Sequence, residues 1–286
     1  MSLSPDVRRR VLLLALVCAQ FVAMLDSSIL NVALPSMSQE LALTRTGSAW
    51  ILNAYFLTFG GFLLVAGRAA DLFGRRRMFL LGSSLLVGSS ALASLATNEA
   101  VVIAARMIQG LGAAALTPAA LSLLLLTFPG EQKARAMSAW GAASALGGAA
   151  GVSVGGVMVT AFGWQSVFII TGAVALANLV VAARLTPPDA VGSQRSFDVA
   201  GAVTVTGAAL AIVFGVLSAP ETGLVSLEVL GSAGVAVALV VVFIIVERRA
   251  VDPVVPLDLF RSATVSAGVA VNLLGGADRV ACFFLV

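Results

Sequence analysis

The sequence predicts an all-α integral membrane protein. Of its 286 residues, 59% are hydrophobic and only 11% are charged, and the mean hydropathy is +1.04. Soluble globular proteins carry about 25% charged residues. The hydrophobic residues form continuous stretches of about 20, which is long enough to cross a bilayer as helices, and they lack the alternating pattern of barrel strands. The net charge of +3 does not predict a nucleic-acid partner, because the basic residues fall between apolar stretches.

Nine apolar stretches of the sequence are long enough to span a membrane. The first follows Arg8, Arg9 and Arg10, is too long for a signal peptide and has no A-x-A cleavage site after it, so we expect a retained anchor. The second to sixth are separated by short connections. The seventh and eighth form a pair between two proline-containing connections, 185–198 and 248–261, and the ninth ends the chain. The nine predicted spans are 11–34, 48–70, 78–97, 100–128, 137–160, 165–184, 198–219, 226–247 and 263–286.

Basic residues are distributed unevenly between these connections. Most of the 17 Lys and Arg residues lie at the N-terminus or in the even-numbered connections, which fits the positive-inside rule when the N-terminus is cytoplasmic. The exceptions are Arg45 in an odd-numbered connection, and Arg106 and Arg279 inside predicted helices. An error of one helix would scramble this pattern. We therefore expect a multi-pass protein of the cell (cytoplasmic) membrane with a cytoplasmic N-terminus.

Asp26 lies in the middle of the first apolar stretch, in FVAMLDSSILNVALP (21–35). An Asp near a helix centre costs roughly 2.5 to 3.5 kcal/mol on insertion scales, so it usually faces a cavity or a partner. On a helix, Gln20, Ser27 and Asn31 share an arc of about 140° with it. One interpretation is a buried polar contact between helices. The other is a titratable group on a polar pathway, because a carboxylic acid in a low dielectric has a raised pKa and can exchange protons near neutral pH.

A second intramembrane charge lies in the fourth stretch, in AARMIQGLGAAALTPA (104–119). Arginine stays charged in proteins, so Arg106 requires a counter-charge, water or backbone carbonyls nearby. A structural ion pair is one interpretation, and a polar pathway beside small residues is the other. The residues that share its helix face are Gln109, Gly110, Ala113 and Thr117.

Glycines mark the fifth stretch, WGAASALGGAAGVSVGGVMV (140–159). Gly141, Gly148, Gly151 and Gly155 are predicted to form one stripe without side chains, which lets two helices approach closely. Taken alone, this packing role is favoured over a role in transport.

The connection after the second stretch, GRAADLFGRRRMFL (67–80), combines an acid, two glycines and three arginines in a short turn. The topology rule explains the arginines but not the acid or the glycines. Tight turns favour glycine, and an acid beside a helix N-terminus is stabilised by the dipole while it pairs with arginine. We expect a charge-latched turn on the cytoplasmic face.

Taken together, these motifs resemble those of the major facilitator superfamily. G-x-x-x-D-x-x-G-R-R-R resembles its signature loop, and LDSSILNVALP, ARMIQGLGAA and GVSVGG resemble the helix 1, helix 4 and helix 5 motifs of its drug/proton antiporters. WILNAYFLTFGG and FDVAGAVTVTGAAL are similar to the fourteen-helix branch, in which two extra helices separate two six-helix bundles. The resemblance covers nearly all of residues 11–286.

The resemblance implies a major facilitator fold with about nine transmembrane helices present. An N-terminal six-helix bundle would occupy 1–190, a central two-helix insertion 191–248, and the first helix of a C-terminal bundle 249–286. Because the second bundle would be represented by one helix, and the sequence stops at ACFFLV without a polar tail, we expect a truncated, N-terminal portion of a transporter.

The resemblance also implies roles for particular residues. Asp26 and Arg106 would take part in proton or substrate coupling, and Gln20, Asn31, Gln109 and Thr117 are cavity candidates. The cytoplasmic gate loop would contain Gly67, Asp71, Gly74 and Arg75. The antiporter motif would contain Gly151, Gly155 and Gly156.

Three features depart from the family pattern. Val152 stands where the helix 5 motif usually has proline, which puts the expected kink in doubt. Gln165 follows Trp164 where arginine is common in the branch. Asp278 and Arg279 belong to no motif, and either a cavity position or a pair with a neighbouring group fits them.

The predicted function is proton-coupled efflux of a drug or antibiotic, with small lipophilic compounds, cationic ones included, as substrates, and with protons and the lipid bilayer as further partners. The alternative is a truncated, non-transporting membrane protein, either inert or associated with an intact exporter. We do not expect an enzyme, because no acid/base pair, nucleophile elbow or phosphate loop is present. With no histidine and both cysteines in apolar stretches, no metal or cofactor site is expected. Substrate identity and oligomeric state stay open.

Overall fold

The computed structural model describes residues 4–186, 189, 198–250, 252–255, 257–271 and 275. Within them, eight helices are long and apolar enough to cross a membrane, which confirms the first eight predicted spans. Their bounds are α1 Pro5–Glu40, α2 Arg45–Phe73, α3 Arg75–Ser94, α4 Glu99–Thr127, α5 Glu131–Phe162, α6 Gln165–Leu185, α7 Val199–Thr222 and α8 Leu227–Glu247. A short 3-10 helix, η1, covers Leu257–Arg261.

The predicted ninth span falls largely outside the described residues. Residues 263–271 are helical, which agrees with its beginning. Asp278 and Arg279 lie beyond the described part of the chain.

Several helices begin or end outside the predicted apolar stretches, because hydropathy detects only the apolar part of a membrane helix. Polar side chains extend the helices by accepting hydrogen bonds from the first free backbone amides. Thr44 accepts from the amide of Gly47 at 2.8 Å, and Asn98 accepts from the amide of Val101 at 3.0 Å. Asp198 caps α7 in the same way.

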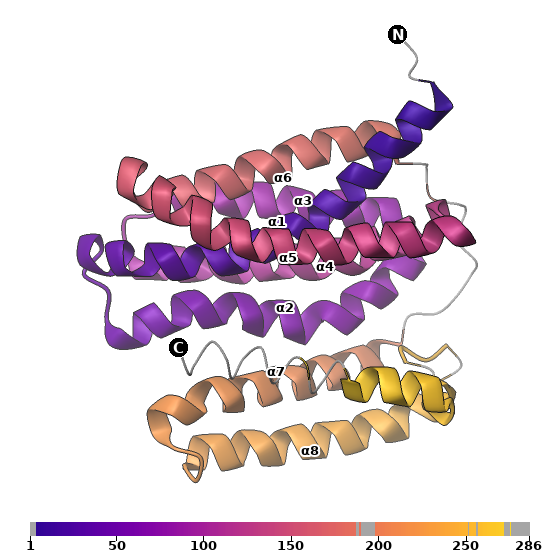
Figure 1. The fold of residues 1–286 in the computed structure, drawn as a ribbon. Coiled ribbons are helices and arrows are strands. Elements are labelled where there is room, and N and C mark those ends of the chain that lie inside the picture. The colour runs from indigo at the N-terminus through magenta and orange to yellow at the C-terminus, as the bar shows by residue number, and fades with distance from the viewer. Residues whose placement is uncertain are drawn as a thin grey trace.

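The helices form a six-helix bundle with a helix pair on one side (Figure 1). In the bundle, α1 packs against α5 and α6, and α4 packs against α2 and α3. The pair α7–α8 joins the bundle through α2, which contacts α7. This arrangement agrees with a boundary near residue 190, although that boundary and the one near residue 248 stay predictions.

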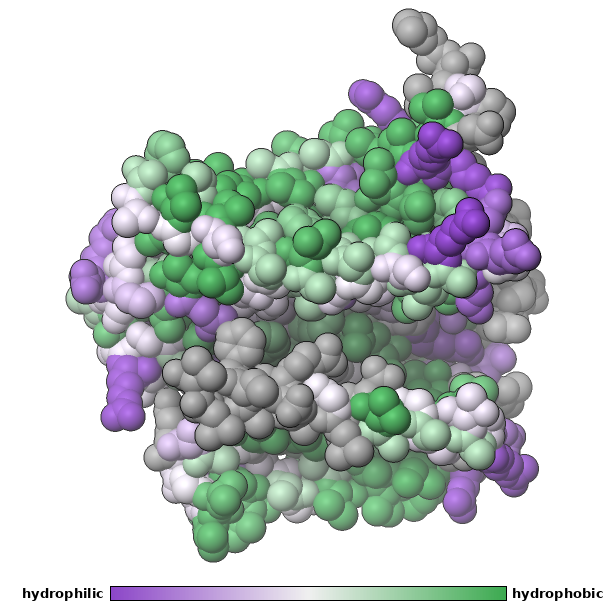
Figure 2. Space-filling view, in the orientation of Figure 1, coloured by the Kyte–Doolittle hydropathy of each residue, from purple (hydrophilic) through white to green (hydrophobic). Residues whose placement is uncertain are grey.

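The surface is apolar across its middle and hydrophilic at its ends (Figure 2). In the view of Figure 2, hydrophobic residues cover most of the central face, and hydrophilic residues gather at the two ends of the helices. Such a band matches the hydrocarbon core of a bilayer with polar headgroups on either side. The chain is a multi-pass membrane protein.

Helix α5 approaches α1 closely through a stripe of glycines. A Cβ atom on Gly147 would lie 2.5 Å from the carbonyl oxygen of Phe21, and one on Gly155 would lie 2.7 Å from Cγ1 of Ile29. A Cβ atom on Gly151 would also meet α1, 3.0 Å from the carbonyl oxygen of Leu25. These glycines recur every four residues, which is the spacing of one helix ridge.

The predicted glycine stripe was therefore partly wrong. Gly151 and Gly155 do face α1, but a Cβ atom on Gly141 would meet nothing within 4 Å, and one on Gly148 would make only an ordinary contact with Ser28 at 3.7 Å. Gly141 and Gly148 lie away from the line along which α5 approaches α1 most closely, whereas Gly147 lies on it, four residues before Gly151.

Candidate functional site

A buried ion pair joins α1 and α4 inside the bundle. Nη1 of Arg106 lies 2.6 Å from Oδ2 of Asp26, and the two side chains are only 1% and 2% exposed. The two intramembrane charges that stood out in the sequence are thus each other's counter-charge. The geometry agrees with the interpretation of Arg106 as a member of an ion pair.

Three further groups hold the guanidinium of Arg106. Its Nη1 also donates to Oε1 of Gln109 at 2.8 Å, and its Nε donates to the carbonyl oxygen of Ile51 at 3.3 Å. Its Cζ lies 4.4 Å from the centroid of the Tyr55 ring, a distance typical of a cation–π contact. The arginine is therefore held by more than its acid.

Gln109 extends the network to a further helix. Its Nε2 donates to Oγ of Ser90 on α3 at 3.0 Å and lies 3.4 Å from Oδ1 of Asp26. The hydroxyl of Tyr55 donates to the carbonyl oxygen of Ala23 on α1 at 3.4 Å. Together, the side chains of Asp26, Tyr55, Ser90, Arg106 and Gln109 form what we call the Asp26 network, which ties α1, α2, α3 and α4 together.

Two network members, Tyr55 and Ser90, were not among the residues predicted from the sequence. A tyrosine or a serine inside an apolar helix gives no charge signal. The available hint was that Tyr55 is the single tyrosine of the chain and follows the polar Asn53 in the second stretch. Whether Ser90 faces α4 depends on how α3 and α4 pack against each other, which the sequence does not show.

Close backbone packing between α2 and α4 helps to bury the network. A Cβ atom on Gly110 would lie 2.4 Å from the carbonyl oxygen of Tyr55, so only glycine fits at this crossing. Thr58 fastens the crossing by donating to the carbonyl oxygen of Met107 at 2.9 Å. In such a low-dielectric setting, an ion pair is strongly coupled, and loss of one partner leaves a costly unpaired charge.

The remaining cavity candidates are not in the network. Gln20 donates through Nε2 to Oγ of Ser144 on α5 at 3.2 Å. Asn31 is exposed and donates back to the carbonyl oxygen of Ser27 at 3.2 Å. Oγ1 of Thr117 is buried and has no hydrogen-bond partner within the described residues. The structure does not hydrogen-bond any of these three residues to Asp26.

The predicted gate loop forms a sharp turn between α2 and α3. Oδ1 of Asp71 lies 2.8 Å from Nη2 of Arg75, and both side chains are partly exposed. Gly74 has a φ of 104°, a conformation that disfavours residues with a side chain. Gly67 lies one turn before Asp71, where a Cβ atom would lie 3.7 Å from Cβ of Pro118 on α4.

Asp189 holds this turn from the connection after α6. Its Oδ1 accepts from the amide of Arg76 at 2.8 Å, and its Oδ2 accepts from the amide of Arg77 at 3.2 Å. The carboxylate thus caps the N-terminus of α3, where the helix dipole favours negative charge. Arg76 in turn donates to the carbonyl oxygen of Ala183 on α6 at 2.8 Å.

The role of Asp189 was not predicted from the sequence. The prolines beside it indicated only a linker, and a cap contributed from more than 100 positions away leaves no local pattern. Within the described part of the chain, no group of three His, Cys, Asp or Glu side chains is placed to hold a metal ion.

Two departures from the family pattern have local explanations. Helix α5 continues through Val152, which is half exposed, so the chain is helical where a proline was expected to kink it. Gln165 begins α6 and donates through Nε2 to Oε1 of Glu40 at 3.0 Å, which fastens α6 to the end of α1.

Comparisons with known proteins point to one family. The model of the Major Facilitator Superfamily matches residues 16–277. EfpA of Mycobacterium tuberculosis, described as an uncharacterized MFS-type transporter, is 38% identical over 258 residues, which cover 90% of this chain and 48% of EfpA. The tetracenomycin C resistance and export protein of Streptomyces glaucescens is 36% identical over 275 residues, which cover 96% of this chain and 51% of that protein.

The chain spans about half the length of the curated relatives it matches. Among solved structures, a POT family peptide transporter in complex with sulfate superposes with a TM-score of 0.62 at 16% identity, covering 85% of this chain and 53% of that structure. At this identity the likeness concerns the fold alone.

Proposed function

The chain belongs to the Major Facilitator Superfamily, and from that membership we propose that it works in proton-coupled export of small lipophilic drugs or antibiotics, with Asp26 as the proton-binding group. The site of action is the cytoplasmic membrane, with the N-terminus in the cytoplasm. Relatives whose names describe antibiotic resistance and export support the choice of substrate class.

The buried pair of Asp26 and Arg106 is the observation that carries this proposal. A charge pair inside a membrane helix bundle is expensive to build and marks ion or substrate pathways. Here the arginine keeps Gln109, the Ile51 carbonyl and the Tyr55 ring even when its acid is neutral. The site is therefore built to hold Arg106 in place in both charge states of Asp26.

Protonation of Asp26 would change the net charge of the site from zero to +1. The neutral acid no longer compensates the guanidinium, so a cationic substrate nearby is repelled. Conversely, a bound cation favours the ionised acid. A proton and a cationic substrate then compete for the same region, which is the coupling that antiport requires.

The Asp71–Arg75 pair and the glycines of α5 have accompanying roles in this proposal. The partly exposed pair and the turn at Gly74 would form the cytoplasmic gate latch. Gly151, Gly155 and the neighbouring Gly156 shape the face of α5 that lies along α1. Rocking of one bundle against another is the motion that such a latch would control.

The test is proton-driven export in membrane vesicles that contain the chain. Ethidium, a lipophilic cation, serves as the probe, and its fluorescence is followed after a pH gradient is imposed. We expect Asp26→Asn to reduce proton-driven export to the level of vesicles without the protein, because the carboxamide of asparagine does not take up a proton as a carboxylate does. Asp258→Asn is the matched control, since the Asp258 side chain is 84% exposed and pairs with the exposed Arg261.

Full export by Asp26→Asn would contradict the proton-binding role. Vesicles of the unmodified chain that show no gradient-dependent export would contradict the proposal that this chain exports.

A further inference from the structure

An apolar groove lies between the beginning of α1 and the end of α6, away from the Asp26 network. Its volume is about 440 Å³, within the range of ligand pockets. The groove opens onto the surface of the helix bundle, since Leu14, which lines it, is 67% exposed. Along α1 it extends from Val11 to Cys18, about 10 Å of helix rise, or a third of the hydrocarbon thickness of a bilayer. The groove therefore lies within one leaflet.

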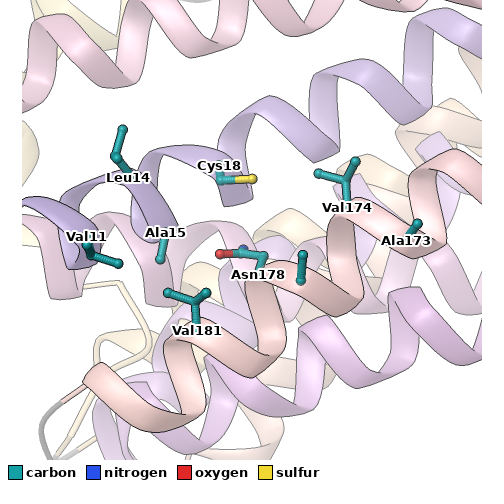
Figure 3. A pocket seen from close by; sticks show the side chains of 9 residues that line it. Val11, Leu14, Ala15, Cys18, Ala173, Val174, Asn178 and Val181 are labelled. Carbon is teal, nitrogen blue, oxygen red and sulfur yellow. The ribbon is translucent and has the colours of Figure 1, made fainter. Parts of the chain in front are cut away.

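One polar side chain interrupts the apolar lining. Asn178 of α6 is 5% exposed, and its Oδ1 is buried without a hydrogen-bond partner within the described residues. In Figure 3 its carboxamide points from α6 toward α1, in the direction of Ala15. An unpaired buried amide oxygen is destabilising, so a ligand that brings a hydrogen-bond donor to this depth is favoured.

Two arginines lie where the groove reaches the end of the helices. Arg8 precedes Val11 by three residues and Arg184 follows Val181 by three, so each continues the face that lines the groove. Both side chains are exposed, and neither has an ion-pair or hydrogen-bond partner within the part of the chain that the structure describes. Arg9, by contrast, turns away and donates to the carbonyl oxygen of Thr127 on α4.

We propose that this groove binds one anionic phospholipid of the leaflet at that end, with the phosphate between Arg8 and Arg184, the glycerol region at Asn178, and an acyl chain against Cys18 and Val174. Asn178 lies six residues before Arg184, about 9 Å of rise, which places it below a headgroup. The NH2 group of a carboxamide donates hydrogen bonds to ester oxygens, and its oxygen accepts hydrogen bonds from hydroxyl groups. Arginines at a membrane surface attract anionic headgroups. This site does not depend on transport activity.

The experiment counts lipids retained by the purified chain in detergent. The chain is incubated with equal amounts of phosphatidylglycerol and phosphatidylcholine of identical acyl chains, and bound lipids are counted by native mass spectrometry. We expect one phosphatidylglycerol to be retained in preference to phosphatidylcholine. Arg8→Gln/Arg184→Gln should lower this preference roughly thirtyfold. Lys133→Gln/Arg135→Gln, which removes the same charge from the exposed start of α5, should leave the preference unchanged.

A second variant tests the groove itself. Ala177 lines the groove and is exposed, so Ala177→Phe fills the space without entering the core. We expect it to abolish retention of both lipids and to leave the thermal stability of the chain unchanged. Equal retention of the two lipids by the unmodified chain would overturn the proposal, and so would an equal loss in the control pair. A dimer that Ala177→Phe dissociates would assign the groove to a second copy instead.

Discussion

The four contacts of Arg106 make it the residue on which the Asp26 network depends. Replacing Arg106 by methionine keeps much of the side-chain volume but leaves Asp26 as an unpaired buried acid. We expect Arg106→Met to lower the free energy of unfolding by about 3 to 5 kcal/mol, as breaking a buried pair usually does. The measurement is unfolding of the purified chain in mixed detergent micelles.

The double variant separates charge from packing. Asp26→Asn/Arg106→Met removes both charges, so it should be more stable than Arg106→Met alone, because no unpaired charge is left. If the double variant were less stable than the unmodified chain by the sum of the losses of Asp26→Asn and Arg106→Met, the two residues would be energetically independent and the pair would not be coupled.

At the residue scale, charge was the signal that sequence reasoning could use. Asp26 and Arg106 stood out because charges in apolar stretches are rare. Gln109 was found because it shares a helix face with Arg106. Tyr55 and Ser90 escaped because their place in the network is set by how α2 and α3 pack against α4, and helical periodicity within one stretch does not contain that information.

At the element scale, the contact of α5 with α1 depends on the glycine positions that face α1. Gly147→Ala would place a Cβ atom 2.5 Å from a backbone oxygen of α1, so the helices must separate. We expect a loss of about 1 to 3 kcal/mol in the free energy of unfolding, as for other overpacked contacts. Gly141→Ala is the matched control on the same helix. Its Cβ atom meets nothing, so the change should be neutral or stabilising by up to about 1 kcal/mol.

An equal loss for both alanine variants would mean that backbone flexibility of α5, not its approach to α1, is what these glycines supply.

The predicted glycine stripe was partly wrong because the sequence does not show how α5 crosses α1. Spacing along one helix shows which glycines share a face, but the crossing with α1 decides which of two neighbouring lines is used. It is the crossing with α1 that places Gly147, and not Gly148, at the closest approach.

The cap that Asp189 places on α3 is a second contact between elements. Asp189→Ala leaves the amides of Arg76 and Arg77 without their acceptor and frees the turn at Gly74. We expect a loss of about 1 to 2 kcal/mol in the free energy of unfolding, together with faster amide hydrogen exchange at the start of α3. Asp258→Ala removes an exposed acid from an exposed pair and should change stability by less than about 1 kcal/mol. Unchanged exchange at residues 76 and 77 would contradict the capping role.

At the scale of the whole molecule, the eight helices and their order followed from hydropathy, because the bilayer requires each span to be long, apolar and helical. The arrangement of those helices did not follow from hydropathy. The connection 185–198 indicated a separation, yet Asp189 binds back to α3 and α7 packs along α2.

The orientation in the membrane is a prediction for the whole chain. With Cys18 and Cys282 replaced by serine, single cysteines are introduced at Val225, which is 83% exposed between α7 and α8, or at Glu131, at the start of α5. A membrane-impermeant maleimide should label Val225→Cys in intact cells and Glu131→Cys only after the membrane is opened. The reverse result would place the N-terminus outside.

The distance along the chain between Asp26 and Arg106 has a consequence for biosynthesis. The two residues lie 80 positions apart. At a synthesis rate of about 5 to 20 residues per second, the acid is made about 4 to 16 s before its counter-charge. During that interval α1 carries a lone carboxylate, so we expect nascent chains stalled before α4 to be extracted from membranes by alkali more readily than chains stalled after it. The first helix would thus be secured in the bilayer only when the fourth arrives.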